Sequence, residues 1–408
     1  METLLLNILG VFFVLGVFFA ISNDRKAINV KLVTKALALQ LLFTVFIVKV
    51  PVGIWLVQKL SDIVSYVLGY GTEGLTFVFG NLVNDPSIFI VNALAGIIFV
   101  ATLIGILNYF GVIELIVTIL GGGLSKLLGV EKNESTVAVS NIFLGQTDAP
   151  LLLGREKLSK MTESQLFLVL VSGMGSISAS IIMAYASMSD AISMTNLVIG
   201  CSLVPLSSII ISKIYYPEKE MDIVVEDIDV NEDKKEVNEE VKSEKKDLML
   251  CVSDSYMNAG NMVLAIAFSL VAIISLVGLV NGLLSNLGVS LEGIVSFIFR
   301  PIVFLMGATG DANIEMSKLL ATKMISNEFV AFSNLASSAS ILENQRLLAM
   351  STVMLLGFAN ISSIGITLSG VGILIPERKE LLAKLCPKAM IGGFAVSVLS
   401  ALMIGLFI

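Results

Sequence analysis

The sequence contains no histidine and only three cysteines, which removes several kinds of chemistry. Histidine is the usual metal ligand and the side chain that relays protons near neutral pH. Its absence excludes histidine-ligated zinc sites, histidine-based nucleophilic catalysis and a histidine proton shuttle. Cys201, Cys251 and Cys386 are too scattered to indicate a disulfide framework.

Charged residues are also scarce, at 14% of the 408 residues, whereas apolar residues make up 56% and the mean hydropathy is +0.92. A soluble domain carries about 25% charged residues. The composition therefore predicts an all-α integral membrane protein. Most of the long apolar runs reach the roughly 20 residues that a spanning helix needs, so we expect eight transmembrane helices. These runs cover residues 4–22, 33–57, 88–111, 166–188, 197–212, 262–287, 347–375 and 389–408.

Basic residues predict how the chain is oriented. Arg25, Lys26, Lys31 and Lys35 follow the first run, and the positive-inside rule places their loop in the cytoplasm. Eight crossings then put the N and C termini outside. Later basic clusters at 155–160, 213–219 and 378–388 fall on the same predicted cytoplasmic side.

We divide the chain into four parts. Residues 1–85 form N-terminal transmembrane helices with an interfacial helix, 86–215 a first repeat, 216–250 an acidic cytoplasmic linker, and 251–408 a second repeat with the C-terminal helices. The net charge of −7 comes largely from the linker, which we expect to be a solvated connector. Amphipathic stretches at 60–70 and 120–129 are expected to lie along the membrane surface.

The two repeats are indicated by a short internal echo. Asn141 of an Asn-x-Phe element precedes Gly173 of a Gly-x-small-polar-Ile-Ser element by 32 positions, and Asn327 precedes Gly357 by 30. In membrane proteins, such duplication with interrupted apolar segments is typical of inverted-repeat transporters that bind substrate where the halves meet.

Two apolar segments are interrupted by polar and helix-breaking residues. The first, 130–153, is broken at 145–150; the second, 297–335, is broken near 307–311 and again at 327–328. Backbone freed by such breaks cannot face lipid, because each unsatisfied group costs several kcal/mol. We expect two re-entrant helical hairpins that line a cavity.

The breaks carry the polar groups that could bind a ligand. Gln146, Thr147 and Asp148 stand together in the first hairpin, and Glu328 lies in the second. An acidic residue at membrane depth is by default functional. Because no Arg or Lys stands in the breaks, the site suits a neutral molecule rich in hydroxyl or amide groups rather than an anion. Glu328 could hold vicinal hydroxyls, and Gln146 could read a planar heteroaromatic edge.

Three motifs, at 145–150 (GQTDAP), 327–331 (NEFVA) and 357–364 (GFANISSI), closely resemble the signature segments of concentrative nucleoside transporters. The resemblance spans nearly the whole chain, including 25–29 and 121–124, and the three motifs together are highly specific. It implies a bacterial, multi-pass inner (plasma) membrane protein. The implied assembly is a homotrimer, in which each protomer moves its own site as an elevator. Its partners would be the lipid bilayer and a nucleoside of the uridine, cytidine or adenosine class, with no nucleic acid.

The resemblance also implies roles for individual residues. The residues implied near the nucleobase are Gln146, Thr147, Asp148 and Ile181, and those implied at the ribose are Glu328, Asn360 and Ser363, with Phe358 available for contact.

A sodium ion would be held between the first hairpin and the following unwound helix. The implied ligands are the side-chain oxygens of Asn141 and Ser176 and the carbonyls of Leu144 and Ile177. Retention of Asn141 and Ser176 favours sodium over protons, although both could simply cap broken helix ends.

Two departures from the family pattern bear on which base the site would prefer. Asp148 stands where the family often has Glu, and 307–311 lacks the Pro-Trp expected there. Three alternatives to sodium-driven import remain: a proton-coupled nucleoside symporter, an intramembrane hydrolase using Asp148 and Glu328 as an acid pair, and a passive channel. The hydrolase lacks an established motif, and a channel would need polar residues along a continuous pore.

Overall fold

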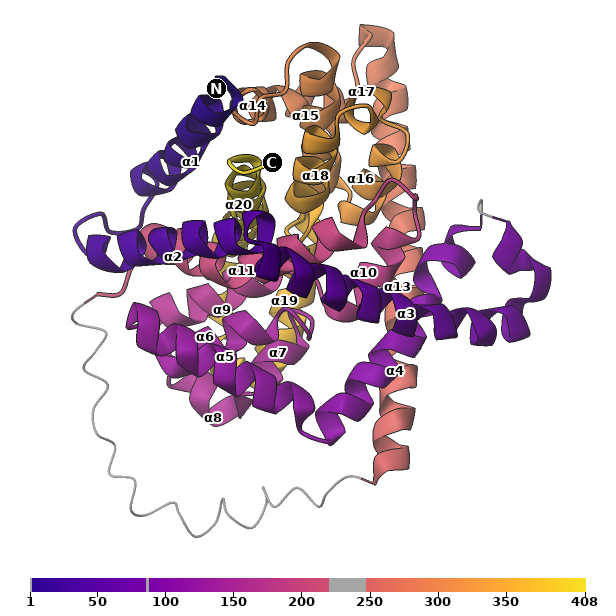
Figure 1. Ribbon diagram of the computed structural model, residues 1–408, viewed down its shortest axis with the longest axis horizontal. Helices are drawn as coiled ribbons and strands as arrows, with labels where there is room; N and C mark the ends of the chain where they lie inside the picture. The colour runs from indigo at the N-terminus through magenta and orange to yellow at the C-terminus, as the bar shows by residue number, and fades with distance from the viewer. Residues whose placement is uncertain (1, 86–87, 220–246) are drawn as a thin grey trace.

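The computed structural model describes residues 2–85, 88–219 and 247–408, and all regular secondary structure in these ranges is helical (Figure 1). The α-helices of the first half are α1 (Glu2–Ala20), α2 (Val30–Lys49), α3 (Pro51–Phe79), α4 (Gly96–Tyr109), α5 (Val112–Leu128), α6 (Lys132–Ser140), α7 (Asp148–Leu151), α8 (Gly154–Ser159), α9 (Glu163–Gly175), α10 (Ala179–Ala186) and α11 (Met194–Tyr215). Those of the second half are α13 (Leu248–Leu284), α14 (Leu291–Leu305), α15 (Gly310–Ile325), α16 (Glu328–Leu335), α17 (Ala339–Leu342), α18 (Gln345–Leu355), α19 (Ile361–Leu374) and α20 (Lys379–Gly405). Short 3-10 and π segments cover Gly80–Asn84, Ile90–Leu94, Ser285–Leu287 and Pro376–Arg378.

Within the described ranges, eight helical segments are long and apolar enough to cross a membrane. They are Glu2–Ala20, Val30–Lys49, Pro51–Asn84, Ile90–Tyr109, Glu163–Ala186, Met194–Tyr215, Leu248–Leu287 and Pro376–Gly405. The predicted all-α membrane protein with about eight spans is confirmed, but the eight segments are not the eight predicted ones.

The predicted span at 33–57 is wrong, because the chain starts a new helix at Pro51. Proline has no backbone N–H and pushes the preceding residue out of the helical region. Val50 is accordingly extended, with φ −81° and ψ 126°, and α3 then runs for 29 residues. The amphipathic stretch predicted at 60–70 is therefore the middle of a long helix, and 120–129 covers the end of α5.

The predicted span at 347–375 is not one helix either. Helix α18 ends at Leu355 and α19 begins at Ile361, with Gly357 between them at φ +97°. Helix α9 similarly ends at Gly175, and α10 resumes at Ala179. Two apolar helices are thus interrupted in mid-course, and each interruption frees backbone groups.

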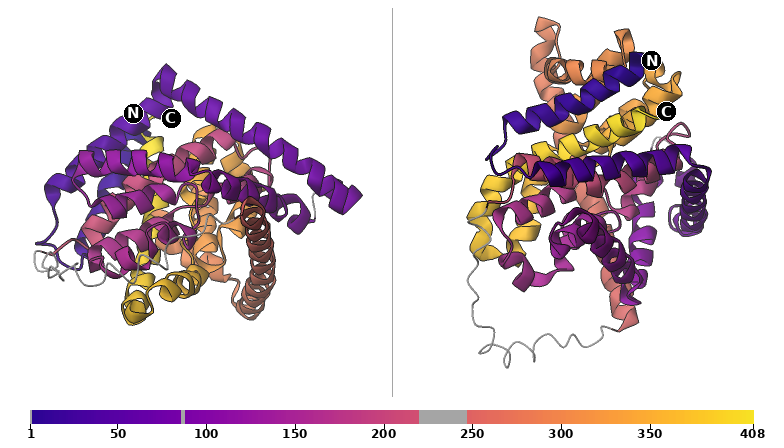
Figure 2. Two further views of the ribbon diagram at one scale, coloured as in Figure 1. Left: turned by 90° about the horizontal axis from the view of Figure 1, so that it is seen from below. Right: turned by 60° about the vertical axis from the view of Figure 1, so that its left-hand side comes forward.

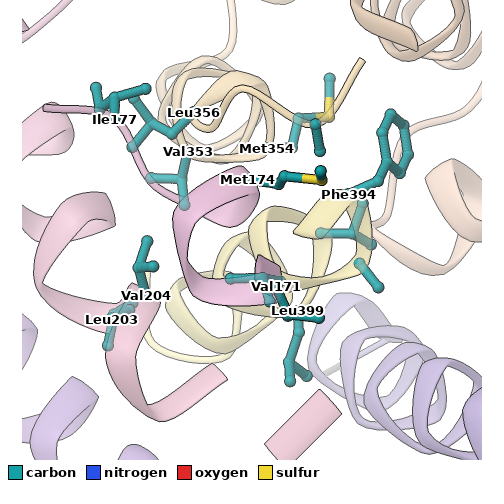
Figure 3. Close-up of a cluster of buried hydrophobic side chains, with 14 of the residues drawn as sticks. Val171, Met174, Ile177, Leu203, Val204, Val353, Met354, Leu356, Phe394 and Leu399 are labelled. Carbon is teal, nitrogen blue, oxygen red and sulfur yellow. The ribbon is translucent and has the colours of Figure 1, made fainter. Parts of the chain in front are cut away.

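The two interrupted helices meet in the apolar core. Figure 3 shows side chains of α9 (Val171, Met174), α11 (Leu203, Val204), α18 (Val353, Met354) and α20 (Phe394, Leu399) packed together. Ile177 and Leu356, from the two breaks, join the same cluster. Helix α20 packs on α9, α11 and α18, so it contacts both of the helices that end at the breaks.

The helices around the predicted breaks have different bounds from the predicted hairpins at 130–153 and 297–335. In the first, α6 is followed by the break at 141–147 and then by α7 and α8; in the second, α15 and α16 are joined through Ser326 and Asn327. Residues 297–305 lie in α14, which packs against α15 as a separate helix. The two chain ends lie close together in both figures that show them (Figures 1 and 2). Most of the predicted acidic linker lies outside the described residues.

Candidate functional site

The second hairpin places a carboxylate at the start of a buried helix. Asn327 caps α16, because its side chain accepts a hydrogen bond from the backbone N–H of Val330 at 3.0 Å. Glu328 is therefore the first residue of the helix, where the N-terminal partial positive charge favours an anion. Its side chain is only 2% exposed.

Both oxygens of the Glu328 carboxylate accept hydrogen bonds from distant parts of the chain. Tyr185 of α10 donates its hydroxyl to Oε1 at 3.2 Å, and Asn360 donates its side-chain amide to Oε2 at 3.0 Å. Asn360 is held in turn as the cap of α19, where its Oδ1 accepts the N–H of Ser363 at 3.0 Å. Three segments are thereby fixed around one buried acid.

The aromatic ring of Tyr185 is clamped in place. It stacks on Phe332 with ring centroids 4.4 Å apart and contacts Phe329 at 5.0 Å. Ile181 lies one turn earlier on α10 and is 2% exposed. The predicted residue Ile181 thus shares a helix with a residue that touches Glu328.

The first hairpin reaches the same helix α19 from another direction. Gln146 is buried, and its side-chain oxygen accepts a hydrogen bond from the hydroxyl of Thr367 at 3.1 Å. Thr147 lies against Gly370, where an added Cβ would be 2.5 Å from a Thr147 methyl carbon. Asp148 begins α7 and is exposed, with its Oδ1 3.3 Å from the Thr147 hydroxyl that donates to it.

Helix α19 relates the two hairpins to each other. Asn360, which holds Glu328, and Thr367, which holds Gln146, are seven positions apart. Seven residues make about two turns, so the two positions share one face and are separated by roughly 10 Å along the axis. The residues that bind the carboxylate and the amide therefore lie about two helical turns apart on the same helix.

Asn141, one of the predicted ion ligands, lies against α9, the helix that precedes Ser176. Asn141 ends α6 and is fully buried; its amide nitrogen donates to the carbonyl of Val137 at 3.1 Å and to the hydroxyl of Ser172 at 3.0 Å. Ser176, one turn after Ser172, follows the end of α9 in extended conformation. The carbonyl of Phe143 accepts from Ala179 at 3.4 Å, so the two breaks lie against each other.

The Oδ1 atom of Asn141 is the feature here that fits a cation. It is buried and has no hydrogen-bond partner among the described residues. A buried oxygen without a donor is costly, and a hard monovalent ion satisfies it. No group of three or more His, Cys, Asp or Glu side chains that could hold a metal occurs in the described ranges, so such a site would use neutral oxygens. Leu144 is half-buried and Ile177 buried in the two breaks beside it.

The two interrupted helices touch directly. A Cβ on Gly357 would lie 2.6 Å from the carbonyl oxygen of Gly175, and Gly357 has the positive φ that favours glycine. The N–H of Phe358 donates to the carbonyl of Ser176 at 3.3 Å. The half-buried Phe358 therefore connects the ion-ligand region with the Glu328 region.

Sequence reasoning missed Tyr185, Thr367 and Lys323. Tyr185 and Thr367 are isolated polar residues in apolar helices, and their partners Glu328 and Gln146 lie 143 and 221 positions away. Lys323 could have been noticed, because it is a lysine in an apolar stretch only five residues before Glu328.

Comparison with known proteins assigns the chain to a family. A model of the C-terminal part of Na+-dependent nucleoside transporters matches residues 196–405, that of the N-terminal part matches 9–82, and a nucleoside-recognition model matches 90–191. The chain belongs to the concentrative nucleoside transporter family. The predicted family is confirmed, and the activity of the chain is nucleoside transport. It is not an enzyme, so the hydrolase alternative is excluded.

Individual relatives resemble this concentrative nucleoside transporter over their full lengths. An uncharacterized transporter of Haemophilus influenzae is 35% identical over 100% of this chain and 98% of its own. The purine nucleoside transport protein NupG of Bacillus subtilis is 30% identical over 99% of both chains. The structure of CNTnw in an inward-facing substrate-bound state matches with a TM-score of 0.87 at 28% identity, over 99% of this chain and 98% of that one.

Proposed function

We propose that this multi-pass membrane protein imports nucleosides by sodium symport. The observation that carries the proposal is that α19 binds both hairpins, since Asn360 donates to Glu328 and Thr367, about two helical turns further on, donates to Gln146. The ribose hydroxyls would bind at Glu328, Asn360 and Ser363. The base would lie toward Gln146, Thr147, Asp148 and Ile181, with Phe358 between.

The charge of the site supports a neutral substrate. Glu328 is a buried acid whose two oxygens are already oriented by Tyr185 and Asn360. An acceptor of this kind binds hydroxyl donors, and a second anion beside it would be strongly disfavoured. A nucleoside offers two vicinal hydroxyls and no charge, whereas a nucleotide carries phosphate.

Sodium is proposed as the coupling ion because the candidate ligands are neutral oxygens. Asn141 Oδ1 lacks a hydrogen-bond partner in the part of the chain that the structure describes, and breaks in α9–α10 and after α6 free backbone carbonyls. A proton-coupled symporter would need a titratable group at this position. Asn141 and Ser176 do not titrate, which favours sodium.

One sodium per nucleoside supplies enough free energy. A tenfold gradient contributes about 1.4 kcal/mol, and a 100 mV potential contributes about 2.3 kcal/mol per charge. Together they permit roughly 500-fold accumulation of a neutral solute.

The proposed mechanism is an elevator in a homotrimer, with the two hairpins forming an inverted, re-entrant repeat in a bacterial plasma membrane. The eight segments long enough to span support an even number of crossings and termini on one side, proposed to be outside. Only 11% of the residues in the most apolar part of Leu248–Leu287, which includes α13, are buried, so this helix is free to contact lipid or a second copy.

Uptake of labelled uridine into proteoliposomes tests this function. Accumulation above equilibrium that requires an inward sodium gradient and leaves uridine chemically intact is expected. Accumulation driven equally by a proton gradient without sodium would contradict sodium coupling. Equilibration without accumulation would instead indicate a channel. Competition by adenosine, cytidine and inosine would rank the bases.

A further inference from the structure

Lys323 is a fully buried charged side chain to which the transport site described above gives no role. It lies in the last turn of α15, five residues before Glu328, and is 0% exposed. An isolated ammonium in such a place costs several kcal/mol unless its donors are satisfied and its charge is balanced. The surroundings of its Nζ atom show how the protein achieves this.

All three N–H donors of the Lys323 ammonium have acceptors. Nζ donates to the carbonyl of Met354 at 2.9 Å, to the carbonyl of Leu356 at 2.6 Å and to the hydroxyl of Ser397 at 2.7 Å. It also lies 5.2 Å from the centre of the Phe394 ring. An ammonium surrounded by carbonyl and hydroxyl oxygens has the ligand set of a monovalent cation site.

Two of these oxygens exist because α18 stops. Helix α18 ends at Leu355, and the last carbonyls of a helix have no partner within it. They carry partial negative charge, which favours a cation at that end. The break that frees them is the same break that brings Gly357 against Gly175.

The first half of the chain has the corresponding break but no lysine. Four positions before Asn327 is Lys323, and four positions before Asn141 is Val137. The Val137 carbonyl accepts from the Asn141 amide, while Asn141 Oδ1 is left without a partner in the described ranges. One break thus contains its own positive charge, and the other offers an open oxygen.

We propose that Lys323 is a built-in cation, whose ammonium occupies in the second half the place that a coupling ion takes in the first. It holds the end of α18, and its charge is opposite to that of Glu328 five positions along the chain. Because this cation is covalently attached, it cannot be exchanged, and only the first break takes an ion from solution. The idea rests on the proposed cation coupling and extends it to the ion-to-nucleoside ratio.

Replacing the lysine by a small residue would convert the built-in cation into an open site. In Lys323→Ala, the oxygens of Met354, Leu356 and Ser397 remain and their ammonium is gone. We expect uptake at low sodium to fall about tenfold or more. High sodium should restore uptake, with a steeper sodium dependence whose Hill coefficient rises from about one to about two. The charge moved per nucleoside should double.

The matched control is Lys213→Ala, which removes another buried lysine with a different environment. Lys213 Nζ pairs with Glu134 Oε2 at 2.7 Å and contacts Ser164 at 3.2 Å, near the end of α11. Its loss should leave the Hill coefficient and the charge per nucleoside unchanged. If the Hill coefficient and the charge per nucleoside change in both variants, the effect is not specific to Lys323, and the proposal is overturned.

A second measurement separates this proposal from the proposed sodium symport. Thermal unfolding of purified Lys323→Ala in sodium, potassium or methylammonium chloride should show stabilisation relative to bulky N-methylglucamine chloride, beyond the shift seen for wild type. This readout needs no transport, so a wild type without sodium-dependent uptake would remove sodium symport alone. A variant that is folded but neither stabilised nor rescued by small cations would overturn the built-in cation. If Lys323→Ala cannot be recovered as folded protein in any of these salts, the built-in cation is also overturned, and Lys323 is a structural residue.

Discussion

The two helix breaks perform related tasks with different chemistry. At the break after α9, the polar side chains are neutral, and Oδ1 of Asn141, which lies at the end of α6, has no partner among the described residues. At the break after α18, a buried acid and a buried lysine lie close together in sequence, and both are fully hydrogen-bonded. The first break, with an oxygen that lacks a donor, suits an ion that binds and dissociates. The second break, with its hydrogen bonds already made, provides a fixed surface that a substrate can recognise.

The largest effect is expected from Glu328→Gln, which removes the charge from the second break. An amide cannot accept from Tyr185 and Asn360 on both of its heavy atoms. Uptake of uridine should fall by about 100-fold or more, because hydrogen bonds to a buried charged group are lost. Glu343→Gln, at an exposed position on the same half, is the control. Uptake near that of wild type in Glu328→Gln would refute the ribose role.

The second largest effect is expected from Asn141→Ala, which removes the Oδ1 atom that has no hydrogen-bond partner among the described residues. The sodium concentration for half-maximal uptake should rise about tenfold, as expected for loss of one ligand worth about 1.4 kcal/mol. Ser176→Ala should act in the same direction with a smaller shift. The comparison variant is Asn108→Ala, at an exposed position of α4. If the sodium dependence is unchanged in both Asn141→Ala and Ser176→Ala, the two residues only cap helix ends, and proton coupling is favoured.

A moderate effect is expected from Tyr185→Phe, which keeps the ring stacked on Phe332 but removes the hydroxyl that donates to Glu328. Loss of one hydrogen bond to a charged group is worth about 1.5 kcal/mol or somewhat more. The KM for uridine should rise about tenfold while the sodium dependence stays the same. A shift in the sodium dependence of uptake would instead contradict the assignment of ion binding to one break and of ribose binding to the other.

The smallest effect is expected from Thr367→Val, which removes the donor to Gln146 with little change in volume. A neutral hydrogen bond contributes about 1 kcal/mol, so KM should rise about fivefold. The ranking of uridine against adenosine should also change, because Gln146 would lose its fixed orientation. Thr118→Val, at an exposed position of α5, controls for the substitution itself. An unaltered ranking would indicate that Gln146 does not read the base.

Local sequence signals were sufficient for the helical membrane fold and for the breaks near Asn141 and Asn327, but the runs 166–188 and 347–375 were predicted as single spans. Glycine, proline and polar residues inside apolar runs mark where a helix cannot continue, and the structure interrupts the chain near Asn141, Ser176, Asn327 and Gly357. The same signal was overlooked at Pro51, where a long apolar run concealed the start of α3. Hydropathy alone predicts one helix there, whereas the backbone restriction of proline predicts that a new helix begins.

The partners of the site residues could not be predicted in this way. Tyr185 reaches Glu328 across 143 positions, and Thr367 reaches Gln146 across 221. Such pairs depend on how α10 and α19 pack in three dimensions, and neither residue is distinguished by its neighbours in sequence. Lys323 was different, since a lysine in an apolar helix beside an acid is itself a signal.

The most direct test is an experimental structure of this protein with uridine bound in sodium chloride. We predict one uridine that touches both hairpins, with its ribose hydroxyls at Glu328 and Asn360 and its base beside Gln146. A uridine bound to one hairpin alone, or a Gln146 side chain too far from Glu328 for one nucleoside to reach both, would contradict the account.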